Sequence, residues 1–190
     1  ALISAGDHVL NVNGVDVVTA SDSSVNANIG ADLASFTADI EFDVVDNANA
    51  IAAEVASSGF GSGGLDEADT VVVSGGDVTA SEADAIQSIS GYDGKASDYD
   101  ITDTAAALIS AGDSVLDVNG VDTVSVTGGA VDADTGEALG ELSKDIEFDV
   151  VDNANAIAAE VTGSNGAGDL DEADTVVVSG GDVTASEADA

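Results

Sequence analysis

The sequence predicts an α/β fold in which parallel strands and helices alternate and successive units stack into a repeat solenoid. First, the seventeen residues at 39–55, DIEFDVVDNANAIAAEV, return unchanged at 145–161. Second, strand-like and helix-like patterns alternate along each copy. Third, the apolar residues are mostly Ala and Val, which allow helices to approach a sheet closely. Compact α/β domains in tandem are the alternative.

The repetition extends over nearly the whole chain. Residues 65–85 recur at 170–190, and the offset between the copies is 106 residues before the loop near residues 56–64 and 105 after it. YDITDTAAALI at 99–109 is similar to FDVVDNANAIA at 42–52, which divides each period into sub-repeats of about 53 residues. We therefore expect a first period at 1–106 and a second, incomplete one at 107–190, both part of a longer tandem array.

Two kinds of strand are predicted. In DIEFDVVD, at 39–46, Ile40, Phe42 and Val44 alternate with acidic residues, which is typical of a half-buried strand. DTVVVSGG, at 69–76, predicts a second strand that ends at its glycine pair. The strand acids Asp43, Asp98 and Asp100 are expected on the solvent face of the sheet.

Ala-rich segments between the strands predict short helices. The helix over 47–55 should begin at Asn47, and the helix over 102–111 at Asp103, since short polar side chains favour the N-cap position. TASEADAIQSI predicts a third helix with a capping box between Thr79 and Glu82.

The charge excludes several classes of partner. Thirty-eight acidic residues face two basic ones, giving a formal charge of −36. Nucleic acid and anionic membrane surfaces are excluded because binding phosphate requires Lys and Arg. No membrane span is predicted, since no apolar run is long enough. The absence of Cys excludes thiolate chemistry. Cations are the expected partners.

No catalytic residue is predicted, and the chain is not expected to be an enzyme. GFGSGG at 59–64 matches a dinucleotide fingerprint, but a helix precedes it where a strand is required. His8 is the only histidine, and Ser114 stands in its place in the second copy. The scarcity of aromatic residues disfavours a glycosidase.

Calcium is the one specific ligand that the sequence suggests. Hard cations prefer oxygen ligands, and several loops place Asp and Asn around a glycine, as in DVNGVD, DADTGE and GDLDEAD. The candidate ligands are Asp117, Asn119, Asp122, Asn11, Asn13, Asp16, Asp132, Asp134, Asp169 and Asp171. Asn-Gly and Asp-Gly also simply form turns, so diffuse screening by cations remains the alternative.

The stretches YDITDTAAALISA and FDVVDNANAIAAE resemble a repeat of very large bacterial surface and secreted proteins, in which an aromatic-x-[Ile/Val]-x-Asp-Thr-Ala-Ala core alternates with TVxVSGG-like strands. Residues 16–30 depart from this pattern because the glycine pair is lost. The resemblance implies an extracellular adhesin, matrix or appendage component and brings no catalytic residues.

Together these features predict a structural extracellular repeat protein that forms or extends a filament, sheath or adhesin stalk and is stabilised by cations. Head-to-tail self-association is expected, because an open end of a repeat stack can receive another copy. One alternative is a calcium-dependent adhesive module that binds cell-surface polysaccharide. An S-layer-type subunit is another.

Overall fold

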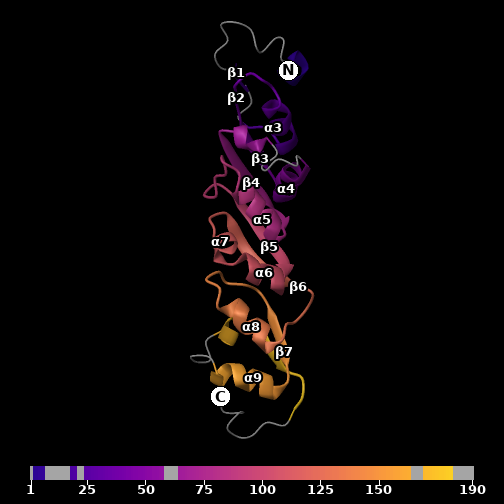
Figure 1. The fold of residues 1–190 in the computed structure, drawn as a ribbon, viewed down its shortest axis with the longest axis vertical. Coiled ribbons are helices and arrows are strands. Elements are labelled where there is room, and N and C mark those ends of the chain that lie inside the picture. The colour runs from indigo at the N-terminus through magenta and orange to yellow at the C-terminus, as the bar shows by residue number, and fades with distance from the viewer. Residues whose placement is uncertain (1, 7–17, 21–23, 58–63, 164–168, 182–190) are drawn as a thin grey trace. The chain divides into compact units, whose positions relative to one another are not determined.

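The computed structural model describes residues 2–6, 18–20, 24–57, 64–163 and 169–181 (Figure 1). Within these residues there are eight α-helices and eight strands, which alternate along most of the chain, and the strand pairs of known register are parallel. The predicted α/β class with parallel strands is thereby confirmed. The chain divides into two compact units, residues 1–100 with 119–122, and residues 101–118 with 123–190. We call them unit 1 and unit 2.

Unit 1 contains most of the first sequence period. Its helices are α1 (Leu2–Ala5), α3 (Ala27–Ala34), α4 (Ala48–Ser57), the 3-10 helix η1 (Leu65–Glu67) and α5 (Ala80–Gln87). Its strands are β1 (Val18–Thr19), β2 (Ile40–Glu41), β3 (Asp43–Asp46), β4 (Thr70–Val78) and the first residues of β5 (Asp98–Thr104) and β6 (Val121–Thr127).

Strand β4 is bonded along both of its edges in unit 1. One edge pairs in parallel with β3, with Thr70 opposite Asp43. On the other edge, the Val71 N–H donates to the Gly91 carbonyl at 2.7 Å, and the Val71 carbonyl accepts from the Asp93 N–H at 2.9 Å. Helix α4 packs against β4, and α5 packs against α4. The core therefore forms where a strand with two neighbours meets a helix.

Unit 2 repeats much of this arrangement with the second sequence copy. Its helices are α6 (Ala105–Ala111), α7 (Asp113–Leu116), α8 (Ala133–Gly140), α9 (Ala154–Gly163) and the 3-10 helix η2 (Asp169–Glu172). Its strands are the remainder of β5 and β6, then β7 (Asp149–Asp152) and β8 (Thr175–Val178). Strands β7 and β8 pair in parallel with the register of β3 and β4, so Thr175 lies opposite Asp149.

The predicted strand faces and two of the helix starts are confirmed. Ile40, Phe42 and Val44 are buried, with exposed fractions of 6, 4 and 0%. Asn47 precedes α4, and its side chain accepts from the Ala50 N–H at 3.0 Å. Thr79 caps α5 in the predicted capping box with Glu82.

Two local predictions were wrong. Strand β4 does not end at its glycine pair, but runs through Gly75 and Gly76 to Val78. The N-cap of α6 is Thr104 and not Asp103, because β5 continues to Thr104, whose hydroxyl accepts from the Ala107 N–H. The Asp103 carboxylate accepts from the Thr104 N–H instead.

A glycine lets a helix approach the sheet at the same place in each unit. In unit 1, a Cβ at Gly30 of α3 would lie 2.8 Å from Cγ2 of Val44 and 3.2 Å from the Phe42 ring. In unit 2, a Cβ at Gly136 of α8 would lie 2.7 Å from Cγ2 of Val150. Real Cβ atoms do not come this close, so even a methyl group would force the helix away from the strand.

We predict that Gly136→Ala destabilises the protein by about 1–3 kcal/mol through overpacking. This sign is opposite to that of an ordinary helical Gly→Ala change, which stabilises by roughly 0.5–1 kcal/mol. Urea unfolding followed by circular dichroism measures the difference. Asp84→Ala, at an exposed position of α5, is the control and should stay within about 0.5 kcal/mol. An unfolding free energy raised by Gly136→Ala would refute the close approach.

Candidate functional site

The predicted calcium loop at 117–122 forms a tight turn in the structure. In unit 1, the Asn119 carbonyl accepts from the Tyr92 hydroxyl at 2.9 Å. Gly120 has φ +101°, and a Cβ at Gly94 would collide with the Asn119 carbonyl. Asp122 is an exposed residue of β6. Gly94 and Gly120 therefore allow the backbone at Asn119 to lie close to the segment that contains Tyr92 and Gly94.

Other predicted ligands serve as helix-end residues in unit 2. Asp117 follows the last residue of α7. Asp132 is the N-cap of α8, and its carboxylate accepts from the Thr135 N–H at 2.9 Å. Hydrogen bonds from the Thr135 side chain and backbone lower the pKa of Asp132. An ionised carboxylate at this position also interacts favourably with the positive end of the helix dipole.

Asp134, also a predicted ligand, belongs to a group of three carboxyls in unit 2. It shares α8 with Glu137, and both act on Glu160 of α9. A hydrogen bond with Glu137, desolvation and the charges of Glu137 and Asp134 together raise the pKa of Glu160 to about 7. The group therefore holds a proton that an isolated glutamate would release well below neutral pH.

The sequence prediction missed Glu137 and Glu160. The i, i+3 spacing of Asp134 and Glu137 would have placed them on one helix face. Glu160 could not be added, because its position depends on the packing of α9 against α8. In unit 1 the counterparts of Asp134 and Glu137 are Asn28 and Ala31. The set of three carboxyls is therefore present in the second copy only.

The remaining predicted ligands are not brought together. Asp169 and Asp171 lie in η2, where Asp171 is exposed. Asn11, Asn13, Asp16 and His8 lie outside the described residues, as does most of the glycine-rich loop at 59–64. Across the described ranges, no group of three or more His, Cys, Asp or Glu side chains is arranged to hold a metal ion.

Several aspartates instead bind backbone N–H groups of distant segments. In unit 1, Asp46 at the end of β3 accepts from the Ala27 N–H at 3.1 Å, and Asp152 repeats this bond with Ala133 in unit 2. Asp113 accepts from both the N–H and the hydroxyl of Ser143, thirty residues away. These carboxylates join the start of a helix or a turn to another segment of the same unit.

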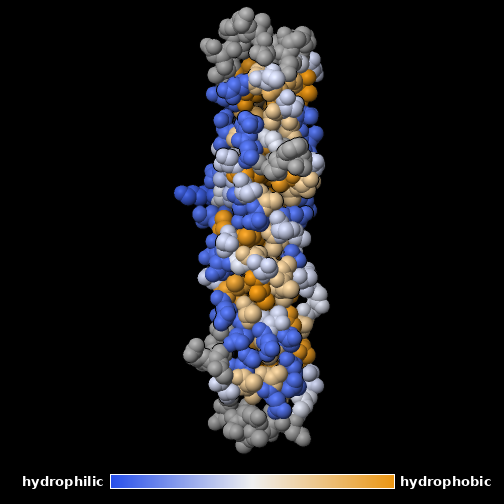
Figure 2. Space-filling view, viewed as in Figure 1, coloured by the Kyte–Doolittle hydropathy of each residue, from blue (hydrophilic) through white to orange (hydrophobic). Residues whose placement is uncertain are grey.

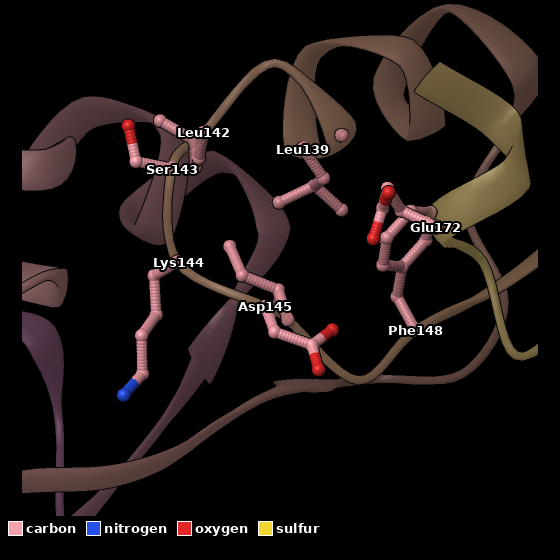
Figure 3. A pocket seen from close by; sticks show the side chains of 9 residues that line it. Leu139, Leu142, Ser143, Lys144, Asp145, Phe148 and Glu172 are labelled. Atoms are coloured by element: carbon pink, nitrogen blue, oxygen red, sulfur yellow. The ribbon is translucent and has the colours of Figure 1, made fainter. Parts of the chain in front are cut away.

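Unit 2 also contains a small pocket of about 170 Å³. Its apolar wall is formed by Leu139, Leu142, Ile146 and Phe148, and its polar residues include Lys144, Asp145 and Glu172. Figure 3 shows the Lys144 side chain extending away from Leu139 and Phe148. In the first copy, Phe36 stands in place of Leu142 and Ala38 in place of Lys144. Part of the pocket lining therefore differs between the two copies.

On the face shown in Figure 2, hydrophilic and hydrophobic residues are interspersed. None of the helices in the described part of the chain combines the length and apolar character that a membrane crossing requires.

No protein-family model, curated protein or solved structure matches this sequence.

The carboxyl group of α8 and α9 predicts a specific pH dependence. Because the folded state raises the pKa of Glu160 to about 7, this residue contributes stability below about pH 4.5 and loses that contribution as the pH rises through about 7. Glu160→Gln should therefore reduce the fall in unfolding free energy between about pH 5 and about pH 8. Urea titrations at both pH values measure it.

Glu54→Gln is the matched control, because Glu54 is the counterpart of Glu160 in the first copy, where the positions of Asp134 and Glu137 hold the uncharged residues Asn28 and Ala31. It should leave the pH dependence of stability unchanged. Equal effects of the two substitutions would show that the carboxyls of α8 do not act on Glu160.

Proposed function

We propose that this chain is a structural, non-enzymatic segment of an extracellular repeat protein of the bacterial surface. Its units stack as a parallel strand-helix solenoid, and its role is mechanical: to form or extend a filament, sheath or adhesin stalk. Cations, Ca²⁺ among them, stabilise it by screening its acidic side chains. Its expected partners are further copies of the repeat and cell-surface polysaccharide.

The observation that carries this proposal is that one sequence pattern makes the same internal contacts twice. The bond from Asp46 to the Ala27 N–H recurs as the bond from Asp152 to the Ala133 N–H. The Thr70 hydroxyl donates to Asp43, and the Thr175 hydroxyl donates to Asp149. Contacts that recur with the sequence are those expected of a repeated building unit, and they support the proposal.

The use of the acidic residues supports a structural role over a catalytic one. Catalysis by paired carboxyls requires them to converge on a substrate. Here Asp46, Asp132 and Asp113 each accept backbone N–H groups, which fixes helix starts and turns. All acidic and basic residues together give a formal charge of −36, which keeps chains apart in solution and must be screened before they can associate.

Thermal unfolding of chains with one, two and three 106-residue periods tests the proposal. If the units stack, each added period contributes an interface, and the Tm should rise with the number of periods. Compact domains in tandem, each stable alone, would give one Tm for all three chains, and that result would refute the stacked arrangement.

The same series measured with EDTA at low salt tests the role of cations. Repulsion between carboxylates then acts unscreened, so every Tm should fall, and added Ca²⁺ should restore it. Mg²⁺ and NaCl, added at matched ionic strength, distinguish specific Ca²⁺ binding from screening. If they restore the Tm as well as Ca²⁺ does, the effect is screening. Midpoints that do not respond to any cation would remove stabilisation by cations from the proposal.

A further inference from the structure

The pocket of unit 2 has a wall of buried apolar side chains. Leu139 belongs to α8, Ile146 and Phe148 precede β7, and all three are at most 4% exposed. Leu142, which is half-buried, completes the wall. The pocket volume of about 170 Å³ is similar to that of an engineered cavity of about 150 Å³ that holds benzene. The pocket therefore has room for an apolar group of about six non-hydrogen atoms.

Hydrogen bonds hold two sides of this pocket in place. Asp113 accepts from the N–H of Ser143 at 2.8 Å and from its hydroxyl at 2.9 Å, which fixes the turn between α8 and β7. On the other side, the Asp174 N–H donates to the Phe148 carbonyl at 2.8 Å and joins the end of η2 to the start of β7. Because η2 also packs against α8, the pocket is formed before any ligand binds, which lowers the cost of binding.

Two exposed acidic residues, Asp145 and Glu172, also line the pocket. Figure 3 shows their carboxylates beside the apolar wall, near Leu139 and Phe148, whereas the Lys144 side chain extends away from it. Within the described part of the chain, no hydrogen bond or ion pair joins either carboxylate to another residue. The pocket therefore offers two negative charges next to an apolar surface.

We propose that this pocket binds a small organic cation, an alkylated ammonium ion. The alkyl groups of the ion lie against Leu139, Ile146 and Phe148, which removes apolar surface from water. Asp145 and Glu172 balance its positive charge. Aromatic rings also attract ammonium groups. The binding of such an ion goes beyond the mechanical role proposed above and does not depend on it.

Other classes of small ligand fit the pocket less well. An anion would be repelled by both carboxylates, and Lys144 extends away from the wall. Ca²⁺ requires about six to eight oxygen ligands, but the wall is apolar, and the described residues contain no group of three acidic side chains arranged for a metal ion. A neutral apolar molecule would leave the two carboxylates unused.

The first copy provides a natural comparison. It retains both acidic residues, as Asp39 and Glu67, but it has Phe36 where the pocket has Leu142. Because Phe is bulkier than Leu, the wall of the pocket is narrowed when Leu142 is exchanged for the residue of the first copy. The first copy also supplies a control position for each carboxylate.

Tetramethylammonium chloride is the probe. It is titrated into the whole 190-residue chain in about 0.15 M NaCl, which screens diffuse attraction to the acidic surface, and the amide signals of residues 142–144 are followed by NMR. We expect saturable shifts with a Kd of roughly 1–10 mM, as suits so small a ligand. tert-Butanol, which has a similar shape but no charge, should bind at least about tenfold more weakly.

Glu172→Gln removes one of the two charges beside the ion and should raise the Kd at least about threefold. Glu67→Gln removes the same charge from the first copy and should change the Kd by less than about twofold. Leu142→Phe should raise the Kd at least about tenfold by filling part of the pocket. Circular dichroism of each variant shows whether it is folded, and the two glutamine variants test the proposal even if Leu142→Phe does not fold.

Shifts that grow linearly with tetramethylammonium and spread over the acidic residues would overturn the proposal, because they would reflect screening alone. Equal effects of Glu172→Gln and Glu67→Gln would overturn it as well, and so would equal affinities for tetramethylammonium and tert-butanol. None of these results alters the dependence of the Tm on the number of periods, so this proposal and the proposed function fail separately.

Discussion

Hydrogen bonding along both edges of short parallel strands is the constraint on which this structure depends. Strands β3, β7 and β8 are four residues long, and a parallel pair of that length buries little apolar surface. Strand β4 is an example with both edges bonded. Strand β3 pairs along one edge, and Gly91, Asp93 and Ser97 form hydrogen bonds along the other. Val71 and Val73 of this strand are fully buried.

The abundant aspartates also have a structural use, because they bind backbone N–H groups. Asp is nearly three times as frequent as Glu, and its short side chain reaches backbone N–H groups close to its own strand or turn, as Asp46 and Asp152 do. Acceptors of this kind fix helix starts where the small core contributes little. Their cost is mutual repulsion, which dissolved salt screens.

Features set by local pattern could be predicted from the sequence. The alternation around Phe42, the Asn47 cap and the capping box of Thr79 depend on neighbouring residues, and each was predicted correctly. Features set by distant contacts could not. Strand β5 extends to Thr104 because β5 belongs to a sheet, and the pKa of Glu160 depends on α8. The candidate calcium loops were recognisable as turns, but their tertiary roles were not.

Amide hydrogen exchange at Val71 and Val176 tests the central claim most directly, because the two residues share one sequence context and, among the described residues, only Val71 has a hydrogen-bonded neighbour at its outer edge. If a strand depends on a neighbour at each edge, the Val71 N–H, bonded to Gly91, should exchange roughly a hundredfold more slowly than the Val176 N–H. Equal protection of the two amides would contradict the account, since the second edge would then contribute nothing to the stability of the strand.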